Sequence, residues 1–240
     1  MLLELARINK RFGAVVVADE VDLAVADGEA LGIIGANGAG KTSLFNLVAG
    51  VLKPDSGVVR LDGHDITGLT ARARCKAGIG RTFQVPRPFE SLSVFENLLV
   101  AAQFGGGDHR GEADECAEVL RHTGLLGKAN GIAGKLTLLD RKRLELARAL
   151  ATRPRLLLLD EIAGGLTEAE CGELVALIRE INGEGVSIIW IEHIVHALFS
   201  VVSRLVVLEF GRKIAEGVPA EVMARPEVRR SYLGIEEEVA

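Results

Sequence analysis

Apolar residues in this chain gather in short runs that alternate with segments of helical character. Runs at residues 30–34, 57–62, 78–83, 156–159, 186–191 and 205–208 predict β-strands, and the apolar spacing at 168–181 predicts a helix. Strands that alternate with helices indicate a parallel sheet. Two earlier runs, at 2–8 and 15–25, suggest an antiparallel portion near the N-terminus. The pattern as a whole predicts an α/β fold.

The middle of the chain has a different pattern. From about residue 85 to residue 151 almost every segment favours helix, including a charged amphipathic stretch at 112–120. Gly105, Gly106 and Gly107 suggest a flexible joint within this region. We therefore expect a helical lobe at residues 85–152, inserted between the two parts of a core at residues 1–84 and 153–240.

Composition narrows the classes of protein. The 240 residues are 48% hydrophobic but only 4% aromatic, so the core must consist mostly of aliphatic residues. A net charge of -5 disfavours a nucleic-acid partner. No apolar run approaches the roughly 18–20 residues that span a bilayer, and the first residues lack a basic signal-peptide start. Cys75, Cys116 and Cys171 share no metal-ligand spacing and are expected to be buried or free thiols in a reducing cytosol.

Residues 35–42 carry the first chemical signal, the complete pattern G-x-x-x-x-G-K-[ST] between a predicted strand and a predicted helix. Glycines let such a loop curl around a phosphate, and the helix N-terminus offers backbone N–H groups to it. Lys41 is expected to reach the β- and γ-phosphates, and the Thr42 hydroxyl to bind Mg²⁺. The flanking elements disfavour a chance glycine-rich turn. The residues expected at the nucleotide are Gly35, Ala36, Asn37, Gly38, Ala39, Gly40, Lys41, Thr42 and Ser43.

The second signal is an apolar strand that ends in two acids, Asp160 and Glu161. Ligands of open α/β sheets bind at the carboxyl ends of the strands, which places both acids beside the phosphate loop. Asp160 is then suited to hold Mg²⁺, and Glu161 to polarise the attacking water. The alternative is a strand that merely ends in solvated acids.

Taken together, these motifs resemble those of an ATP-binding cassette (ABC) ATPase over essentially the whole length of the chain. The resemblance implies a P-loop ABC ATPase with a mixed β core. It assigns adenine stacking to Phe12, contact with Mg²⁺ and the attacking water to Gln84, and contact with the γ-phosphate to His193. Gln84 and His193 thereby join Lys41 and Glu161 as candidate catalytic residues, and Gln84 joins Thr42 and Asp160 as a candidate metal ligand.

Three stretches resemble more specifically the ATPases of branched-chain amino acid importers, the LivG type. They are residues 78–89, residues 160–166, and the tail from residues 214–217 to residues 232–234. This resemblance implies MgATP hydrolysis that drives uptake of a hydrophobic amino acid or a relative such as urea, short amides or aromatic acids. It also implies one of two ATPase subunits, identical or different. They would lie on the cytoplasmic face of the membrane beneath two permeases that receive solute from a periplasmic binding protein.

The chain departs from the family pattern at the signature sequence, usually Leu-Ser-Gly-Gly-Gln. The matching residues are Leu136, Thr137, Leu138, Leu139 and Asp140. Thr137 and Asp140 can form a capping box, whereas the two leucines hinder close approach of a phosphate and Asp140 brings negative charge toward it. Either the stretch completes the partner subunit's site or it is only a capped helix. Two further departures are Ile162 in place of a proline and Thr167 in place of an aspartate.

Other classes of ABC protein share the same core chemistry. An ATPase of an exporter or lipopolysaccharide-transport system is the nearest alternative. A soluble ABC protein of translation or repair would more often carry two cassettes or a long coiled coil. A regulatory module that does not hydrolyse nucleotide would be expected to lack Lys41 or Glu161, and both are present.

Overall fold

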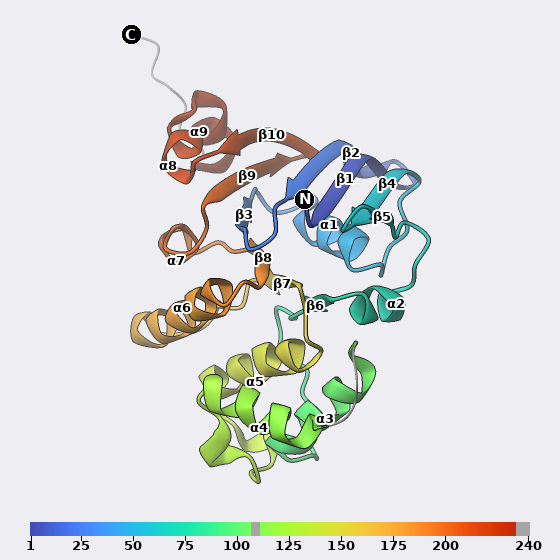
Figure 1. Cartoon of the computed structure of the whole chain (residues 1–240). Helices are drawn as coiled ribbons and strands as arrows, with labels where there is room; N and C mark the ends of the chain where they lie inside the picture. The colour runs from blue at the N-terminus through green and yellow to red at the C-terminus, as the bar shows by residue number, and fades with distance from the viewer. Residues whose placement is uncertain (107–110, 234–240) are drawn as a thin grey trace.

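The fold contains two β-sheets, seen in a computed structural model that describes residues 1–106 and 111–233 (Figure 1). The first sheet is antiparallel, has the strand order β2-β1-β4-β5, and uses mostly N-terminal residues. It consists of β1 (Leu3–Phe12), β2 (Val15–Val25), β4 (Ser56–Leu61) and β5 (His64–Asp65). The antiparallel N-terminal portion is thus confirmed, although β1 extends beyond the expected residues 2–8.

The second sheet has the order β10-β9-β3-β8-β7-β6 and is parallel except for the antiparallel pair formed by β9 and β10. Strands β3, β7 and β8 are buried along their entire lengths, as expected for aliphatic runs covered on both faces. The strands are β10 (Arg212–Gly217), β9 (Arg204–Glu209), β3 (Ala30–Ile34), β8 (Ser187–Ile191), β7 (Leu156–Asp160) and β6 (Ile79–Arg81). Strand β6 is shorter than the predicted 78–83, and β10 was not predicted.

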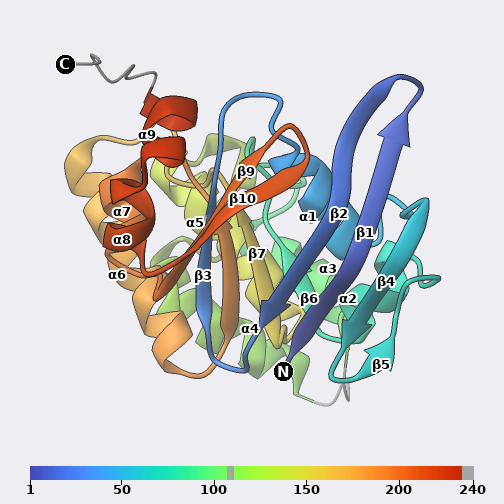
Figure 2. The same ribbon diagram turned by 90° about the horizontal axis from the view of Figure 1, so that it is seen from above.

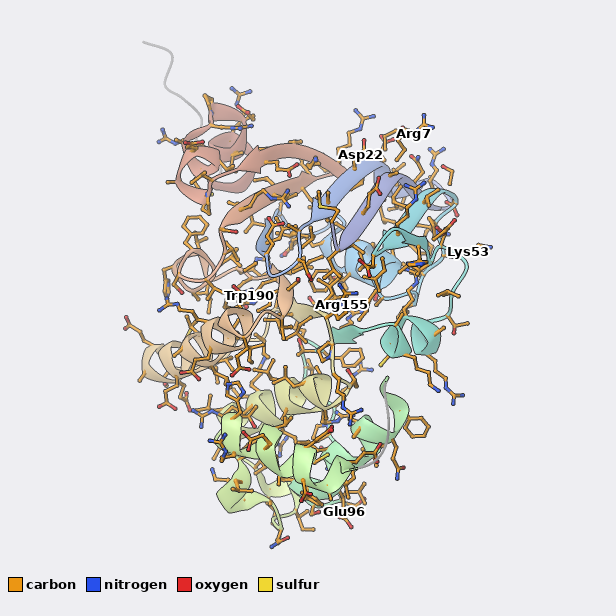
Figure 3. All side chains as sticks on the ribbon, in the orientation of Figure 1. Arg7, Asp22, Lys53, Glu96, Arg155 and Trp190 are labelled. Carbon is orange, nitrogen blue, oxygen red and sulfur yellow. The ribbon has the colours of Figure 1, made fainter. Side chains whose placement is uncertain are left out.

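Two hydrophobic cores cover the faces of the parallel sheet. One lies between the two sheets and includes Phe45 and Leu47 of α1 (Lys41–Val48). The other packs the opposite face against several helices, which lie on the left in Figure 2, and includes the fully buried Trp190 labelled in Figure 3. These helices are α6 (Glu168–Gly183), α7 (Val195–Phe199), α8 (Pro219–Ala224) and α9 (Pro226–Leu233). The fold class predicted from the sequence is confirmed.

The middle of the chain forms helices with a third hydrophobic core of their own, below the sheets in Figure 1. They are α3 (Val94–Phe104), α4 (Glu112–His122) and α5 (Leu138–Ala151), and α2 (Ala71–Lys76) precedes them. Two short 3₁₀ helices, η1 (Leu126–Lys128) and η2 (Ala133–Lys135), lie between α4 and α5. The expectation of nearly continuous helix is wrong at 85–93, where the chain is irregular before the capping box of Ser93 and Glu96 starts α3.

The expected glycine joint is packed rather than open in its described part. A Cβ atom at Gly105 would lie 2.7 Å from Thr152 Cα, and one at Gly106 would lie 2.6 Å from the Lys76 carbonyl oxygen. Both positions therefore need glycine because the neighbouring backbone comes close. Gly107, and Gly234 of the tail resemblance, lie outside the described residues.

The structure also shows the state of the three cysteines. Cys116 and Cys171 are buried, Cys75 is half-buried, and all three are free thiols. Across residues 1–106 and 111–233, no helix is both long enough and apolar enough to cross a membrane.

Candidate nucleotide site

The phosphate loop connects β3 to α1. Gly38 and Gly40 have φ angles of 82° and 101°, in the left-handed region that residues other than glycine rarely adopt. Gly40 lies so close to β2 that a Cβ atom there would meet the Val17 carbonyl oxygen at 2.4 Å. The loop shape therefore depends on these two glycines.

Lys41 lies inside the curve of this loop. Its Nζ donates hydrogen bonds to the carbonyl oxygens of Gly35 at 2.7 Å and Ala36 at 3.1 Å. Burial lowers the pKa of Lys41, and the nearby carboxylates of Glu161 and Asp160 act in the opposite direction. The ammonium group thus lies between the loop carbonyls and the two acids that the sequence singled out.

The other residues predicted to contact the nucleotide differ in exposure. Ala36, Asn37, Gly38 and Thr42 are exposed, Gly40 and Ser43 are half-buried, and Gly35 and Ala39 are buried. Phe12, at the end of β1, is 50% exposed, and Lys10 Nζ lies 5.4 Å from the centre of its ring. The exposed part of the Phe12 ring is accessible to a base.

Asp160, the last residue of β7, is 5% exposed. Its Oδ2 accepts a hydrogen bond from Arg81 Nη2 at 3.0 Å, and its backbone N–H donates to Thr82 Oγ1 at 3.2 Å. Burial raises the pKa of Asp160, whereas the hydrogen bond from Arg81 opposes that shift. Carboxylate and hydroxyl oxygens are hard donors of the kind that Mg²⁺ prefers, so Asp160 and Thr42 fit such an ion.

Glu161, which follows β7, contacts residues that follow the two neighbouring strands. Its carboxylate accepts a hydrogen bond from Gln84 Nε2, and its Oε1 lies 2.7 Å from His193 Nε2. Gln84 follows β6 and His193 follows β8, the two neighbours of β7, so the strand order brings the three side chains together. Glu161 has a φ of 45°, a strained conformation that turns the chain sharply at the sheet edge.

The signature stretch caps α5, but its charge is arranged differently from the expectation. Thr137 Oγ1 accepts a hydrogen bond from the Asp140 N–H at 3.3 Å, and it donates to Asp140 Oδ2 at 2.9 Å. The reciprocal bond to the Thr137 backbone, which a capping box requires, is replaced by this hydroxyl contact. Asp140 is 4% exposed and pairs with Lys128 Nζ at 2.5 Å. Its negative charge is therefore neutralised instead of being presented to a phosphate.

The leucines of this stretch differ in exposure. Leu138 is 44% exposed and Leu139 is 9% exposed, while Leu136 is half-buried. The other two departures have structural roles, since Ile162 is fully buried in the core and Thr167 forms the capping box of α6 with Glu170. The apolar obstacle expected at the signature helix remains at Leu138.

Three charged residues near the site were not singled out by the sequence analysis. Arg81 holds Asp160, as described above. Lys142 Nζ donates to the Gln84 carbonyl oxygen at 3.0 Å, and buried Glu192 accepts the backbone N–H groups of Ala163 and His193 at 3.3 Å each. From sequence alone, a charged residue beside a strand or within a basic run is expected to be solvated. The roles of these three residues therefore become visible only in the tertiary structure.

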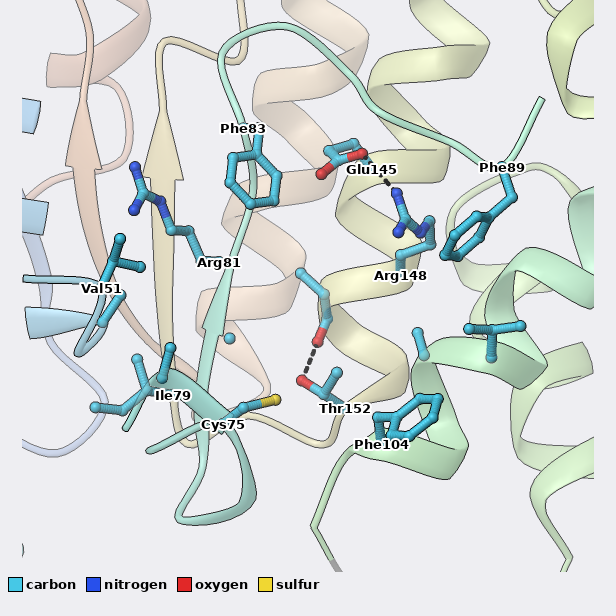
Figure 4. A pocket seen from close by; sticks show the side chains of 16 residues that line it. Val51, Cys75, Ile79, Arg81, Phe83, Phe89, Phe104, Glu145, Arg148 and Thr152 are labelled. Atoms are coloured by element: carbon cyan, nitrogen blue, oxygen red, sulfur yellow. Dashed lines mark hydrogen bonds and ion pairs between the residues drawn. The ribbon is translucent and has the colours of Figure 1, made fainter. Parts of the chain in front are cut away.

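A further cavity, which we call the lobe groove, lies between the core and the helices of the middle region (Figure 4). Its volume is about 360 Å³, and its lining is mostly apolar. The lining includes Val51, Cys75, Arg81, Phe83, Phe89 and Arg148, and Phe104 lies at its far end.

Within the described residues, no group of three or more His, Cys, Asp or Glu side chains could hold a metal ion by itself. A Mg²⁺ ion bound by few protein oxygens together with substrate phosphates agrees with this arrangement.

Comparison with known proteins identifies the class. Residues 18–164 match the family model "ABC transporter", and residues 212–238 match "Branched-chain amino acid ATP-binding cassette transporter". The chain is 36% identical to the high-affinity branched-chain amino acid transport ATP-binding protein BraF of Pseudomonas aeruginosa, over 97% of this chain and 98% of BraF. It shares the same identity and coverage with LivG of Escherichia coli.

Solved structures agree with the sequence relatives. The ADP conformation of MJ1267, an ATP-binding cassette of an ABC transporter, superimposes with a TM-score of 0.90 and 29% identity, over 98% of this chain and 99% of MJ1267. The chain therefore belongs to the ABC transporter family, and it is an ATPase of the P-loop type. Within that family it belongs to the branched-chain amino acid transporter group.

Proposed function

We propose that this chain binds and hydrolyses MgATP with the residues gathered at the ends of β3, β6, β7 and β8. The observation that carries the proposal is the contact of Glu161 with both Gln84 and His193, next to the loop that holds Lys41. Phosphoryl transfer depends mainly on positioning and on neutralising charge. In this proposal Lys41 and the loop amides bind the phosphates, and Phe12 stacks on the adenine.

Glu161 takes the role of orienting and polarising the attacking water, and His193 contacts the γ-phosphate. Thr42, Asp160 and Gln84 hold Mg²⁺, which supplies charge neutralisation to the phosphates when bound. In this proposal the signature stretch, residues 136–140, approaches the nucleotide of a second ATPase subunit through its exposed Leu138, while Asp140 stays paired with Lys128. A site divided between two subunits would couple hydrolysis to their closure.

The transport role proposed is import of branched-chain or other hydrophobic amino acids, with the chain attached to the inner face of the membrane. The names of the relatives and the C-terminal family match support it. Two ATPase subunits, alike or different, would bind two permeases, and a periplasmic binding protein would deliver the solute. The lobe groove is the proposed seat for a cytoplasmic helix of a permease, because its apolar lining is accessible beside Phe83 and Phe89, which are 41% and 46% exposed.

Site-directed crosslinking tests the importer role. Cys75 is first replaced by serine, because this free thiol lines the groove. New cysteines at Phe89 or Ser91 should then crosslink to a cytoplasmic loop of the permeases encoded with this chain, in membranes that contain the whole complex. Glu227→Cys, an exposed position on α9, is the matched control, because α9 lies on the far side of the sheets from the helices that line the groove (Figure 1). Crosslinks that form only with soluble proteins would refute the importer role, and uptake of radiolabelled leucine by the same membranes tests the solute class.

A further inference from the structure

Arg81 connects two elements of the nucleotide site through one guanidinium group. Its Nη1 donates to Asn46 Oδ1 of α1 at 2.5 Å, and its Nη2 donates to Asp160 Oδ2 of β7 at 3.0 Å. The side chains of Arg81 and Asp160 are only 12% and 7% exposed, so water competes little for this pair. The planar guanidinium group therefore ties the acid at the end of β7 to the helix that follows the phosphate loop.

The same guanidinium group contacts two aromatic rings. Its Cζ lies 5.9 Å from the centre of the Phe45 ring, which is fully buried, and 5.4 Å from the centre of the Phe83 ring. Phe83 is 41% exposed and lines the lobe groove, as Figure 4 shows. A continuous set of contacts thus runs from the groove surface through Phe83 and Arg81 to Asp160.

Arginine is suited to this place for a geometric reason. Its fixed fork can hold Asn46 and Asp160 at the same time, whereas a lysine ammonium keeps the charge but is a single point on a flexible stem. Groups that orient a metal-binding carboxylate raise metal affinity because the oxygen is held in place before the ion arrives. A change of partner therefore acts on metal binding without removing any metal ligand.

We propose that Arg81 is a positioning residue for the Mg²⁺-binding carboxylate of Asp160, and that Phe83 passes movement at the lobe groove to it. The inference rests on the proposed function in taking Asp160 as a Mg²⁺ ligand. It adds a second connection between groove and nucleotide site, which runs through Phe83 and through Arg81 at the end of β6 and is separate from the contact of Gln84 with Glu161. A permease helix seated against Phe83 would shift the guanidinium group and so change how the metal is held.

The test measures binding of Mn²⁺, a paramagnetic substitute for Mg²⁺, to the full-length chain by electron paramagnetic resonance. Saturating ADP is present, so hydrolysis cannot contribute. Arg81→Lys should raise the Mn²⁺ dissociation constant about tenfold, the usual cost of losing a residue that orients a ligand. Arg148→Lys is the matched control, because Arg148 lines the same groove and stacks on Phe89 at 5.2 Å but bonds to Glu145 and the Arg87 carbonyl instead of Asp160. This control should keep the wild-type dissociation constant.

The groove side is tested with Phe83→Leu, which should raise the dissociation constant about threefold through loss of the ring contact. In the Arg81→Lys background the same substitution should add nothing, because the connection is already broken. Phe104→Leu, at the far end of the groove, is the control for a general effect on the lining. A threefold effect that persists in the Arg81→Lys background, or that Phe104→Leu reproduces, would overturn the connection through Phe83.

An Arg81→Lys chain with wild-type Mn²⁺ affinity would overturn the positioning role. Should that variant fail to fold, as judged by circular dichroism, Asn46→Ala removes the second anchor of the guanidinium group and should weaken Mn²⁺ binding about threefold. Unchanged affinity in Asn46→Ala would overturn the proposal in the same way. Asp160→Asn separates the two levels, since unchanged Mn²⁺ binding in that variant would refute the metal assignment of the proposed function itself.

Discussion

Replacement of Glu161 by glutamine keeps the size of the side chain and removes its negative charge. The carboxylate, 18% exposed, contacts Gln84 and His193, and a glutamine can still make one bond to each because its amide both donates and accepts. Hydrogen bonds to a charged group are about twice as strong as neutral ones, so the exchange should cost about 1 kcal/mol of stability. For a chain of this size that corresponds to a fall in Tm of about 2–4 °C.

Turnover should fall far more than stability. A general base contributes roughly 10²–10⁴-fold, which equals about 2.7–5.4 kcal/mol of transition-state stabilisation. Affinity for MgATP should change little, because in the proposed mechanism Glu161 acts on the water and does not hold the phosphates in the ground state. The expected result is therefore a subunit that folds and binds nucleotide but hardly hydrolyses it.

The assay is ATP hydrolysis by the complex with its permeases, together with nucleotide binding and thermal unfolding of the same preparations. Glu168→Gln is the matched control, since Glu168 is exposed at the start of α6. Hydrolysis near the wild-type rate in Glu161→Gln would refute the assignment of Glu161. A loss of nucleotide binding equal to the loss of turnover would also contradict it, because Glu161 would then act on the ground state.

Three further predictions follow from other parts of the site. Lys41→Ala should weaken ATP binding as well as turnover, because Lys41 meets the phosphates before hydrolysis; calorimetric titration measures this, and unchanged affinity would show that the loop does not hold the nucleotide as proposed. Glu192→Gln tests the buried acid, whose pKa is raised by burial above 4.5, so that its folded form binds more protons than the unfolded chain. The wild type should therefore lose stability relative to the variant as pH rises above 4.5, the ordinary pKa of a glutamate, and a Tm difference that stays constant would contradict this. In a heterodimer, loss of Glu161 should reduce transport more than loss of the equivalent glutamate of the partner, because Leu138 obstructs the second site; equal losses would show that the leucine is tolerated.

The phosphate loop could be predicted from the sequence because each of its parts leaves a local mark. A buried strand, glycines at fixed spacing and a lysine at the start of a helix occur together within residues 30–41. Strand β10 leaves no such mark, since only Ala215 among its six residues is buried. Edge strands with polar residues on both faces lack the apolar alternation that signals a strand.

The arrangement of the candidate catalytic residues depends on strand order, which no local pattern reveals. Gln84 and Glu161 are 77 positions apart, and Glu161 and His193 are 32 positions apart. Family resemblance names these residues, whereas their contact arises because β6, β7 and β8 are neighbours. Arg81 and Lys142 illustrate the same limit, because a charged side chain is buried only when other elements supply its partners.

The outermost strands of the two sheets are short or carry charged side chains. An exposed strand edge presents unpaired N–H and C=O groups, and so invites pairing with another chain and aggregation. The parallel sheet ends at β6, only three residues long, and at β10, which carries Arg212, Lys213 and Glu216. The antiparallel sheet ends on one side at β5, only two residues long. If the chain docks on permeases as proposed, these short or charged edges limit pairing between its copies before it does so.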